Sequence, residues 1–155
     1  MDHVQGIEKN LLEFEIKEFL KKKRAQLFAL SLKSDNNLSI ENIDKMSGFE
    51  FESFLEEIFT SIGYSVENIR DTKDQGVDLI VEHHGERTAI QAKRYSKNVS
   101  NSAVQQIFSA KKFYNCDRAM VVTNSDFTKS AKELAKSLNV ELISGLELNK
   151  MIKNR

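Results

Sequence analysis

The sequence predicts an α/β fold in which a mixed β-sheet carries helices on both faces. Apolar stripes with helical spacing alternate with short runs rich in Val, Ile and Met, which are typical of buried strands. The first three predicted strands follow one another closely, which favours an antiparallel meander, whereas helices separate the later strands, which favours parallel pairing. The length of 155 residues, with 40% hydrophobic and 30% charged residues, is typical of one ordinary globular domain.

The chain begins with a segment that is expected to be helical from residue 4 to about residue 33. Apolar residues recur there at helical spacing, and no glycine follows Gly6. The polar run at 34–37 ends this helix, and a short amphipathic piece follows it. We assign residues 1–46 to a helical extension that serves packing or dimerisation, with binding of a specific partner as the alternative, and residues 47–155 to a second domain.

The second domain begins with a helix that Gly63 ends, and its buried face is marked by Phe51, Leu55, Ile58, Phe59 and Ile62. The elements expected after it are a strand 64–69, a polar loop 70–76, a hairpin of strands 77–83 and 87–93, a helix 100–114, a strand 118–123, a helix 127–138 capped by Ser125 or Asp126, a strand 140–143 and a terminal helix from about Leu146.

The hairpin brings three polar residues together. A two-residue turn at His84-Gly85 pairs the strands so that Asp78 lies opposite Gln91. Alternation along the second strand then places Lys93 on the same sheet face as Gln91. The prediction depends on this register, because a slip of one residue would separate the three side chains.

These residues suit the hydrolysis of a phosphodiester bond, which needs an aligned water and a cation that offsets developing negative charge. Mg²⁺ prefers oxygen ligands and keeps several waters. We expect Asp78 as the primary ligand, the Gln91 side-chain oxygen and the Ala92 carbonyl as neutral ligands, and Glu52 as a ligand of a second ion or of a metal-bound water. Lys93 would orient the attacking water or stabilise charge on the phosphate, and Mn²⁺ is expected to replace Mg²⁺.

A plainer interpretation exists for each of these residues. An Asp–Lys pair on an exposed hairpin contributes less than about 1 kcal/mol and needs no chemistry to explain it. A carboxylate beside an apolar helix face, such as Glu52, often only covers the core.

Six short motifs occur in order between about Ser47 and Ile152. They are Gly48-Phe49-Glu50-Phe51-Glu52, Ile62-Gly63-Tyr64, Asp74-Gln75-Gly76-Val77-Asp78-Leu79-Ile80, Gln91-Ala92-Lys93-Arg94-Tyr95, Val121-Val122-Thr123-Asn124 and Phe127-Thr128. As an ordered set they resemble the catalytic domain of the Mrr-type restriction endonucleases, within the PD-(D/E)xK nuclease superfamily.

The resemblance implies a restriction-endonuclease-like α/β/α core, preceded here by the helical extension. It places Glu52, Asp78, Gln91 and Lys93 at the catalytic positions of enzymes that cut DNA with Mg²⁺, often as dimers. The neutral Gln91 stands where the wider superfamily carries an acid, which matches the Mrr branch and lowers the negative charge of the site. Residues 1–46 are shorter than most of the DNA-reading domains that Mrr-type enzymes carry.

Four further residues are candidates for contacts with nucleic acid: Arg94, Tyr95, Gln105 and Lys111. The first two follow Lys93 directly. The other two lie on the predicted helix 100–114, where a solvated helix face is the alternative.

Bulk composition adds little to this picture. The net charge is zero, with 23 basic and 23 acidic residues, so only local basic clusters would hold phosphates. The single cysteine, Cys116, excludes an intrachain disulfide. No apolar run approaches the roughly 18 residues that span a bilayer, so we expect a cytoplasmic protein without a membrane partner.

We therefore expect a Mg²⁺-dependent DNA endonuclease, a hydrolase acting as a homodimer in restriction or defence against foreign DNA. One alternative is a Holliday-junction resolvase or repair nuclease of the same fold. Another is a catalytically silent module that binds DNA or a partner. Activation by a partner protein, the choice of DNA over RNA, the cleavage specificity and the number of metal ions stay open.

Overall fold

The computed structural model describes residues 6–16, 40–69 and 76–153. Contacts divide the chain into two units, Met1–Asn36 and Asn37–Arg155. In the first unit, residues 6–16 are helical, as predicted, and the remainder of the expected helix lies outside the described residues.

The second unit begins earlier than residue 47. It includes the short helix α2 (Ile40–Asp44), which the sequence pattern groups with the extension. Ile43 and Met46 belong to the buried core of this unit, with 0% and 4% of their surface exposed. The predicted loop 70–76 lies outside the described residues except for Gly76.

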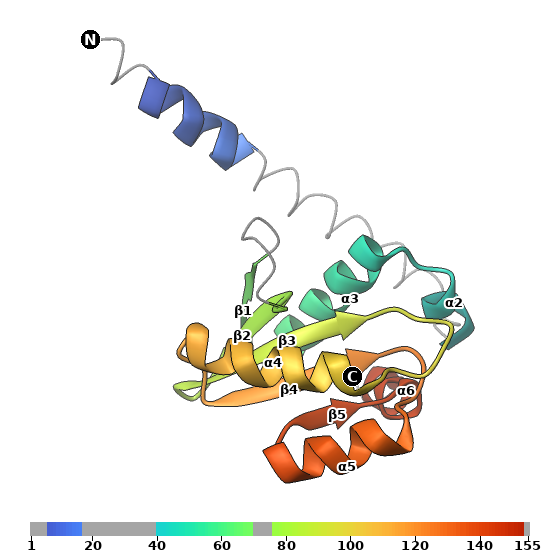
Figure 1. Ribbon diagram of the computed structural model, residues 1–155. Helices are drawn as coiled ribbons and strands as arrows, with labels where there is room; N and C mark the ends of the chain where they lie inside the picture. The colour runs from blue at the N-terminus through green and yellow to red at the C-terminus, as the bar shows by residue number, and fades with distance from the viewer. Residues whose placement is uncertain (1–5, 17–39, 70–75, 154–155) are drawn as a thin grey trace. The chain divides into compact units, whose positions relative to one another are not determined.

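The described part of the second unit begins with two helices and three consecutive strands, after which helices and strands alternate (Figure 1). After α2 the elements are α3 (Gly48–Ser61), β1 (Ser65–Asn68), β2 (Leu79–His83), β3 (Glu86–Lys93), α4 (Asn101–Phe113), β4 (Arg118–Thr123), α5 (Lys129–Leu138), β5 (Glu141–Ile143) and α6 (Gly145–Lys153).

The strands form a five-stranded mixed sheet in the order β1-β2-β3-β4-β5. The first three pair antiparallel, and β3, β4 and β5 pair parallel, as the connection lengths predict. The hairpin register is also as predicted, because Leu79 pairs with Ile90 and Ile80 with Ala89. The hairpin turn agrees with this register, since His84 and Gly85 have positive φ values of 52° and 79°, as a type I′ turn requires.

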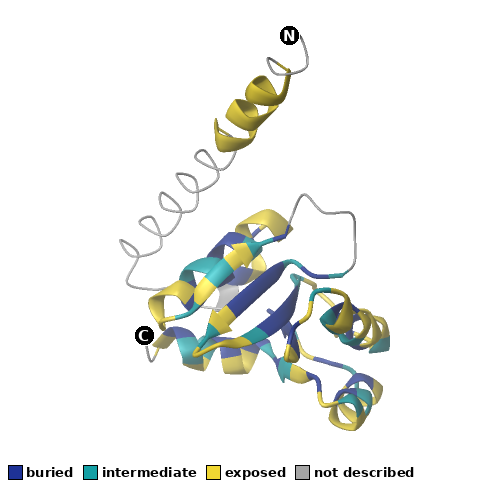
Figure 2. Cartoon of the chain, turned by 90° about the vertical axis from the view of Figure 1, so that its left-hand side faces the viewer, coloured by how far each residue is buried: buried dark blue, intermediate teal, exposed yellow. Residues whose placement is uncertain are grey.

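Helices cover both faces of this sheet. On one face α4 packs on β3 and β4, and α5 packs on β5; on the other, α3 packs on β1, β2 and β3, and α6 packs on β4 and β5. The central strands are therefore buried on both sides, which explains why β4 is a nearly continuous apolar run. Figure 2 shows these buried strands between helices whose outer faces are exposed.

The predicted start of α5 is wrong. Helix α5 begins at Lys129, and its N-cap is Thr128, whose Oγ1 accepts a hydrogen bond of 3.0 Å from the Ala131 N–H. Phe127 lies in the core and its backbone bridges to Val99, so it is not available to start the helix. The predicted stop of α3 at Gly63 is confirmed, because the helix ends at Ser61, Ile62 is its C-cap and Gly63 follows with a positive φ of 98°. Ile62 was predicted on the buried face of this helix and is instead 43% exposed.

Candidate active site

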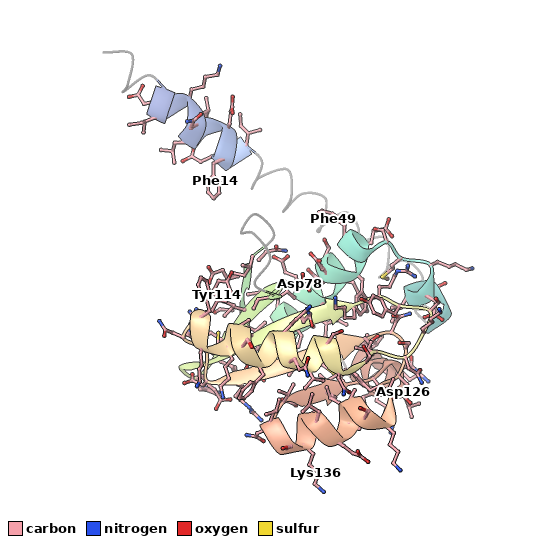
Figure 3. All side chains as sticks on the ribbon, in the orientation of Figure 1. Phe14, Phe49, Asp78, Tyr114, Asp126 and Lys136 are labelled. Carbon is pink, nitrogen blue, oxygen red and sulfur yellow. The ribbon has the colours of Figure 1, made fainter. Side chains whose placement is uncertain are left out.

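A cavity of about 780 Å³ lies where α3, the β2–β3 hairpin and α4 come together. Asp78, labelled in Figure 3, lies at this junction. The residues that line the cavity come from segments that are far apart in the sequence: Gly48, Glu52, Gly76, Val77, Asp78, Gln91, Ala92, Lys93, Arg94, Tyr95, Gln105, Gln106 and Ser109.

The cavity brings together the five residues predicted for chemistry and metal binding: Glu52, Asp78, Gln91, Ala92 and Lys93. Three of the four candidates for nucleic-acid contacts also line it: Arg94, Tyr95 and Gln105. The fourth, Lys111, lies in the last turn of α4 and does not line the cavity.

The backbone holds Asp78 against the sheet. It precedes β2, where its N–H donates to the Ile90 carbonyl at 2.9 Å and its carbonyl accepts from the Ile69 N–H at 3.1 Å. Its side-chain Oδ2 accepts from the Ala92 N–H at 2.8 Å. The carboxylate is thus fixed next to the end of β3, the strand that carries Gln91 and Lys93.

The pKa of Asp78 is raised from 3.8 to about 6. Burial is the largest cause, and the neighbouring Glu52 carboxyl adds to it by charge repulsion and a side-chain hydrogen bond. The Ala92 N–H and the positive charge of Lys93 act in the opposite direction. The ionised form of Asp78 is therefore poorly compensated in this cavity, next to a second acidic side chain.

Gln91 is a polar residue in an otherwise apolar part of β3, with 3% of its surface exposed. Its Nε2 donates to Oε1 of Gln106, on α4, at 2.9 Å. Its own Oε1 is buried and has no hydrogen-bond partner. An unpaired buried oxygen is costly, so this atom suits a ligand.

Lys93 stands at the end of β3, where neighbouring segments fix its backbone. Its carbonyl accepts a hydrogen bond from Oγ1 of Thr123 at 2.6 Å. Two residues later, the Tyr95 N–H donates to Oδ1 of Asn124 at 2.7 Å. Its Nζ lies 5.4 Å from the centre of the Tyr95 ring, within the range of a cation–π contact.

A second cavity of about 260 Å³ shares Arg94 and Tyr95 with the first and also includes Asp44, Ser96, Asn124 and Ser125. Arg94 Nη1 donates to the Asp44 carbonyl at 3.1 Å, whereas Arg94 Nε is buried without a partner. Asn124 Nδ2 donates to Oδ1 of Asp44 at 2.7 Å, which ties α2 to the end of β4.

Sequence reasoning missed Gln106 and the Asp44–Asn124 pair. Helix periodicity gave no signal for Gln106, because this residue is exposed and lies outside the buried face of α4. Nothing in the sequence signals the Asp44–Asn124 contact, which joins residues 80 positions apart.

The donor atoms of the cavity fit a hard divalent cation. Among the described residues, no three His, Cys, Asp or Glu side chains come together as a metal site. The cavity offers instead two carboxylates, Asp78 and Glu52, and the unpaired oxygen of Gln91. An all-oxygen set of this kind suits Mg²⁺ or Mn²⁺ better than Zn²⁺.

The helix-flanked mixed sheet, with a cavity beside its central hairpin, is the core of the restriction-endonuclease fold. A model of the restriction endonuclease family Mrr_cat matches residues 43–152. The chain therefore belongs to this family, which confirms the predicted family and the predicted fold.

Known proteins agree with this assignment. The type IV methyl-directed restriction enzyme EcoKMrr of Escherichia coli (strain K12) is 26% identical over 125 residues, which are 74% of this chain and 41% of that enzyme. The chain thus spans less than half the length of this relative.

Two solved structures share the fold. The DNA modification-dependent restriction endonuclease AspBHI superposes with a TM-score of 0.59 at 17% identity, over 74% of this chain and 34% of that chain. A protein of unknown function, AF1548, superposes with a TM-score of 0.52 at 17% identity, over 59% and 54% of the two chains. Within the described residues, no helix has the length and apolar character needed to cross a membrane.

Proposed function

We propose that the chain is a Mg²⁺-dependent DNA endonuclease that acts in restriction or defence against foreign DNA. The observation that carries the proposal is the convergence of Glu52, Asp78, Gln91 and Lys93, from α3 and both arms of the hairpin, on one cavity. The plainer interpretation of an exposed Asp–Lys pair does not account for it, because Asp78 is half-buried and its pKa is raised.

Each residue has a distinct role in this proposal. Asp78, the Gln91 Oε1 and the Ala92 carbonyl hold one divalent cation, and Glu52 holds a second ion or a bound water. When bound, Mg²⁺ supplies Lewis acidity and offsets negative charge on the scissile phosphate. Lys93 orients the attacking water or stabilises charge on the phosphate oxygens, and the Tyr95 ring keeps its ammonium in place.

The neighbouring cavity supports a path for the nucleic acid. Arg94 and Tyr95 line both cavities, so a strand whose scissile phosphate occupies the first passes directly beside the second. The unpaired Nε–H of Arg94 is a donor for a phosphate oxygen there, and Gln105 is a further contact. Four points stay predictions: the homodimer, the cytoplasmic location, activation by a partner and a nucleic-acid contact by Lys111.

A cleavage assay on supercoiled plasmid tests the proposal. Wild type is expected to cut with Mg²⁺ or Mn²⁺ and not with EDTA. Lys93→Ala should lose at least about 100-fold in rate, since it removes a preorganised charge from the reacting phosphate. Lys136→Ala, an exposed lysine on α5, is the matched control and should cut like wild type.

The substrates should include methylated and unmethylated plasmid, because EcoKMrr is methyl-directed, and a four-way junction. Equal cleavage by Lys93→Ala and wild type would remove Lys93 from the mechanism. Preference for the junction would favour a resolvase, and failure of wild type on every substrate would favour a silent binding module.

A further inference from the structure

The Gln91 side chain can bind a cation through only one of its two ends. An amide has an oxygen that accepts and a nitrogen that donates, in nearly equal volumes, so a half-turn exchanges them. With the nitrogen turned toward a cation the site would repel it. The contact made by the other end of the amide therefore decides whether Gln91 serves as a ligand.

Gln106 supplies that contact. Its Oε1 accepts the hydrogen bond from Gln91 Nε2 at 2.9 Å, across the gap between α4 and β3. The Gln91 Oε1 is left without a partner although it is buried. The nitrogen is satisfied and the oxygen is free, which is the orientation that a cation requires.

Gly76 lies close to both glutamines. A Cβ atom at Gly76 would lie 3.1 Å from the Cβ of Gln106 and 3.4 Å from the Nε2 of Gln91. The chain at Gly76 thus lies against the Gln91 amide nitrogen and the base of the Gln106 side chain, and a Cβ there would make a tight contact with the Gln106 Cβ. This packing limits the alternative positions that the Gln91 amide can adopt.

We infer that Gln106 is a positioning residue, which orients the Gln91 amide so that its oxygen faces a divalent cation. The inference rests on the proposed function, because it assumes that Gln91 is a ligand. Gln106 itself does not touch the cation. Groups that orient metal ligands in this way typically change metal affinity by about 10- to 100-fold when they are removed.

The test is Mn²⁺ binding to the full chain without DNA, measured by isothermal titration calorimetry. Gln106→Met keeps the length of the side chain but removes the acceptor, and should weaken Mn²⁺ binding about 10-fold. Gln106→Glu keeps an acceptor toward Gln91 Nε2, and should bind Mn²⁺ within about threefold of wild type or more tightly. Lys112→Met, also exposed on α4, is the control and should leave the affinity unchanged.

Circular dichroism should show that all three variants fold, since both positions are exposed. Wild-type affinity in Gln106→Met would overturn the inference. Equal losses in Gln106→Met and Gln106→Glu would also overturn it, because they would point to a disturbance of α4 and not to the acceptor. Absence of Mn²⁺ binding by wild type would instead contradict the proposed metal site, so the two failures are distinguishable.

Discussion

Asp78 is a partly buried carboxyl group in the cavity. Its carboxyl is largely buried beside Glu52, and both effects raise its pKa from 3.8 to about 6. A raised pKa means that the folded state holds the proton more tightly than the unfolded state. The stability of the metal-free protein therefore falls as pH rises from about 4 to above 6, and the full penalty is present at neutral pH.

Asp78→Asn should stabilise the metal-free protein at pH 7.5. The neutral amide removes the buried charge, while its oxygen still accepts from the Ala92 N–H. Because one pKa unit corresponds to about 1.4 kcal/mol, the gain should be about 1–3 kcal/mol in the free energy of unfolding, measured with urea in EDTA. The gain should shrink at pH 4, where the carboxyl is protonated in the folded state.

Adding Mg²⁺ provides the control for this prediction. Wild type should be stabilised by the cation because the folded state alone binds it, whereas Asp78→Asn should respond weakly. If the Asp78→Asn variant were less stable than wild type in EDTA at pH 7.5, that result would contradict the assigned cause of the pKa shift.

At the residue scale, the sequence predicts that three polar side chains of the hairpin lie close together, but not what positions them. Asp78, Gln91 and Lys93 follow from one turn and the alternation of a strand, both of which are local signals. The role of Gln106 depends on how α4 packs against β3, and neither segment encodes that distance by itself.

At the scale of elements, the hairpin was predictable because its turn is short. His84-Gly85 admits few geometries, and the observed pairs follow the register that this turn dictates. The start of α5 was not predictable in this way, since Phe127 is held by a bridge to Val99, in a segment more than 20 residues earlier. Tertiary contacts override local capping signals there.

The loop before β2 offers a test at this scale. Gly76 and Gly85 have nearly the same positive φ, 78° and 79°, so alanine should cost each about 1–2 kcal/mol of stability through backbone strain. Of the two, only a Cβ at Gly76 would contact the glutamines, through the Gln91 Nε2 and the Gln106 Cβ; nothing lies within 4 Å of a Cβ at Gly85.

Gly76→Ala should therefore lose Mn²⁺ affinity as well as stability, and Gly85→Ala should lose stability alone. Urea unfolding and calorimetry on both variants separate the two effects. Equal Mn²⁺ affinity in both variants would show that the contact of residue 76 with Gln91 and Gln106 does not affect Gln91 as a metal ligand.

At the scale of the whole chain, both cavities belong to one of the two units. Every residue that lines either cavity belongs to Asn37–Arg155. The helical segment 6–16 contributes no residue to them and carries five large apolar side chains that are 49–60% exposed: Ile7, Leu11, Leu12, Phe14 and Ile16. Apolar side chains gathered in this way favour association with another surface.

Removing residues 1–36 should therefore leave a chain that unfolds cooperatively, with a midpoint within a few degrees of the full chain and the same Mn²⁺ affinity. Its mass by light scattering should fall from a dimer to a monomer, because the segment that favours association is gone. With one active site per particle, it should nick plasmid but produce little linear product. A shortened chain that stays dimeric would assign dimerisation to the second unit, and one that fails to fold would show that the two units are interdependent.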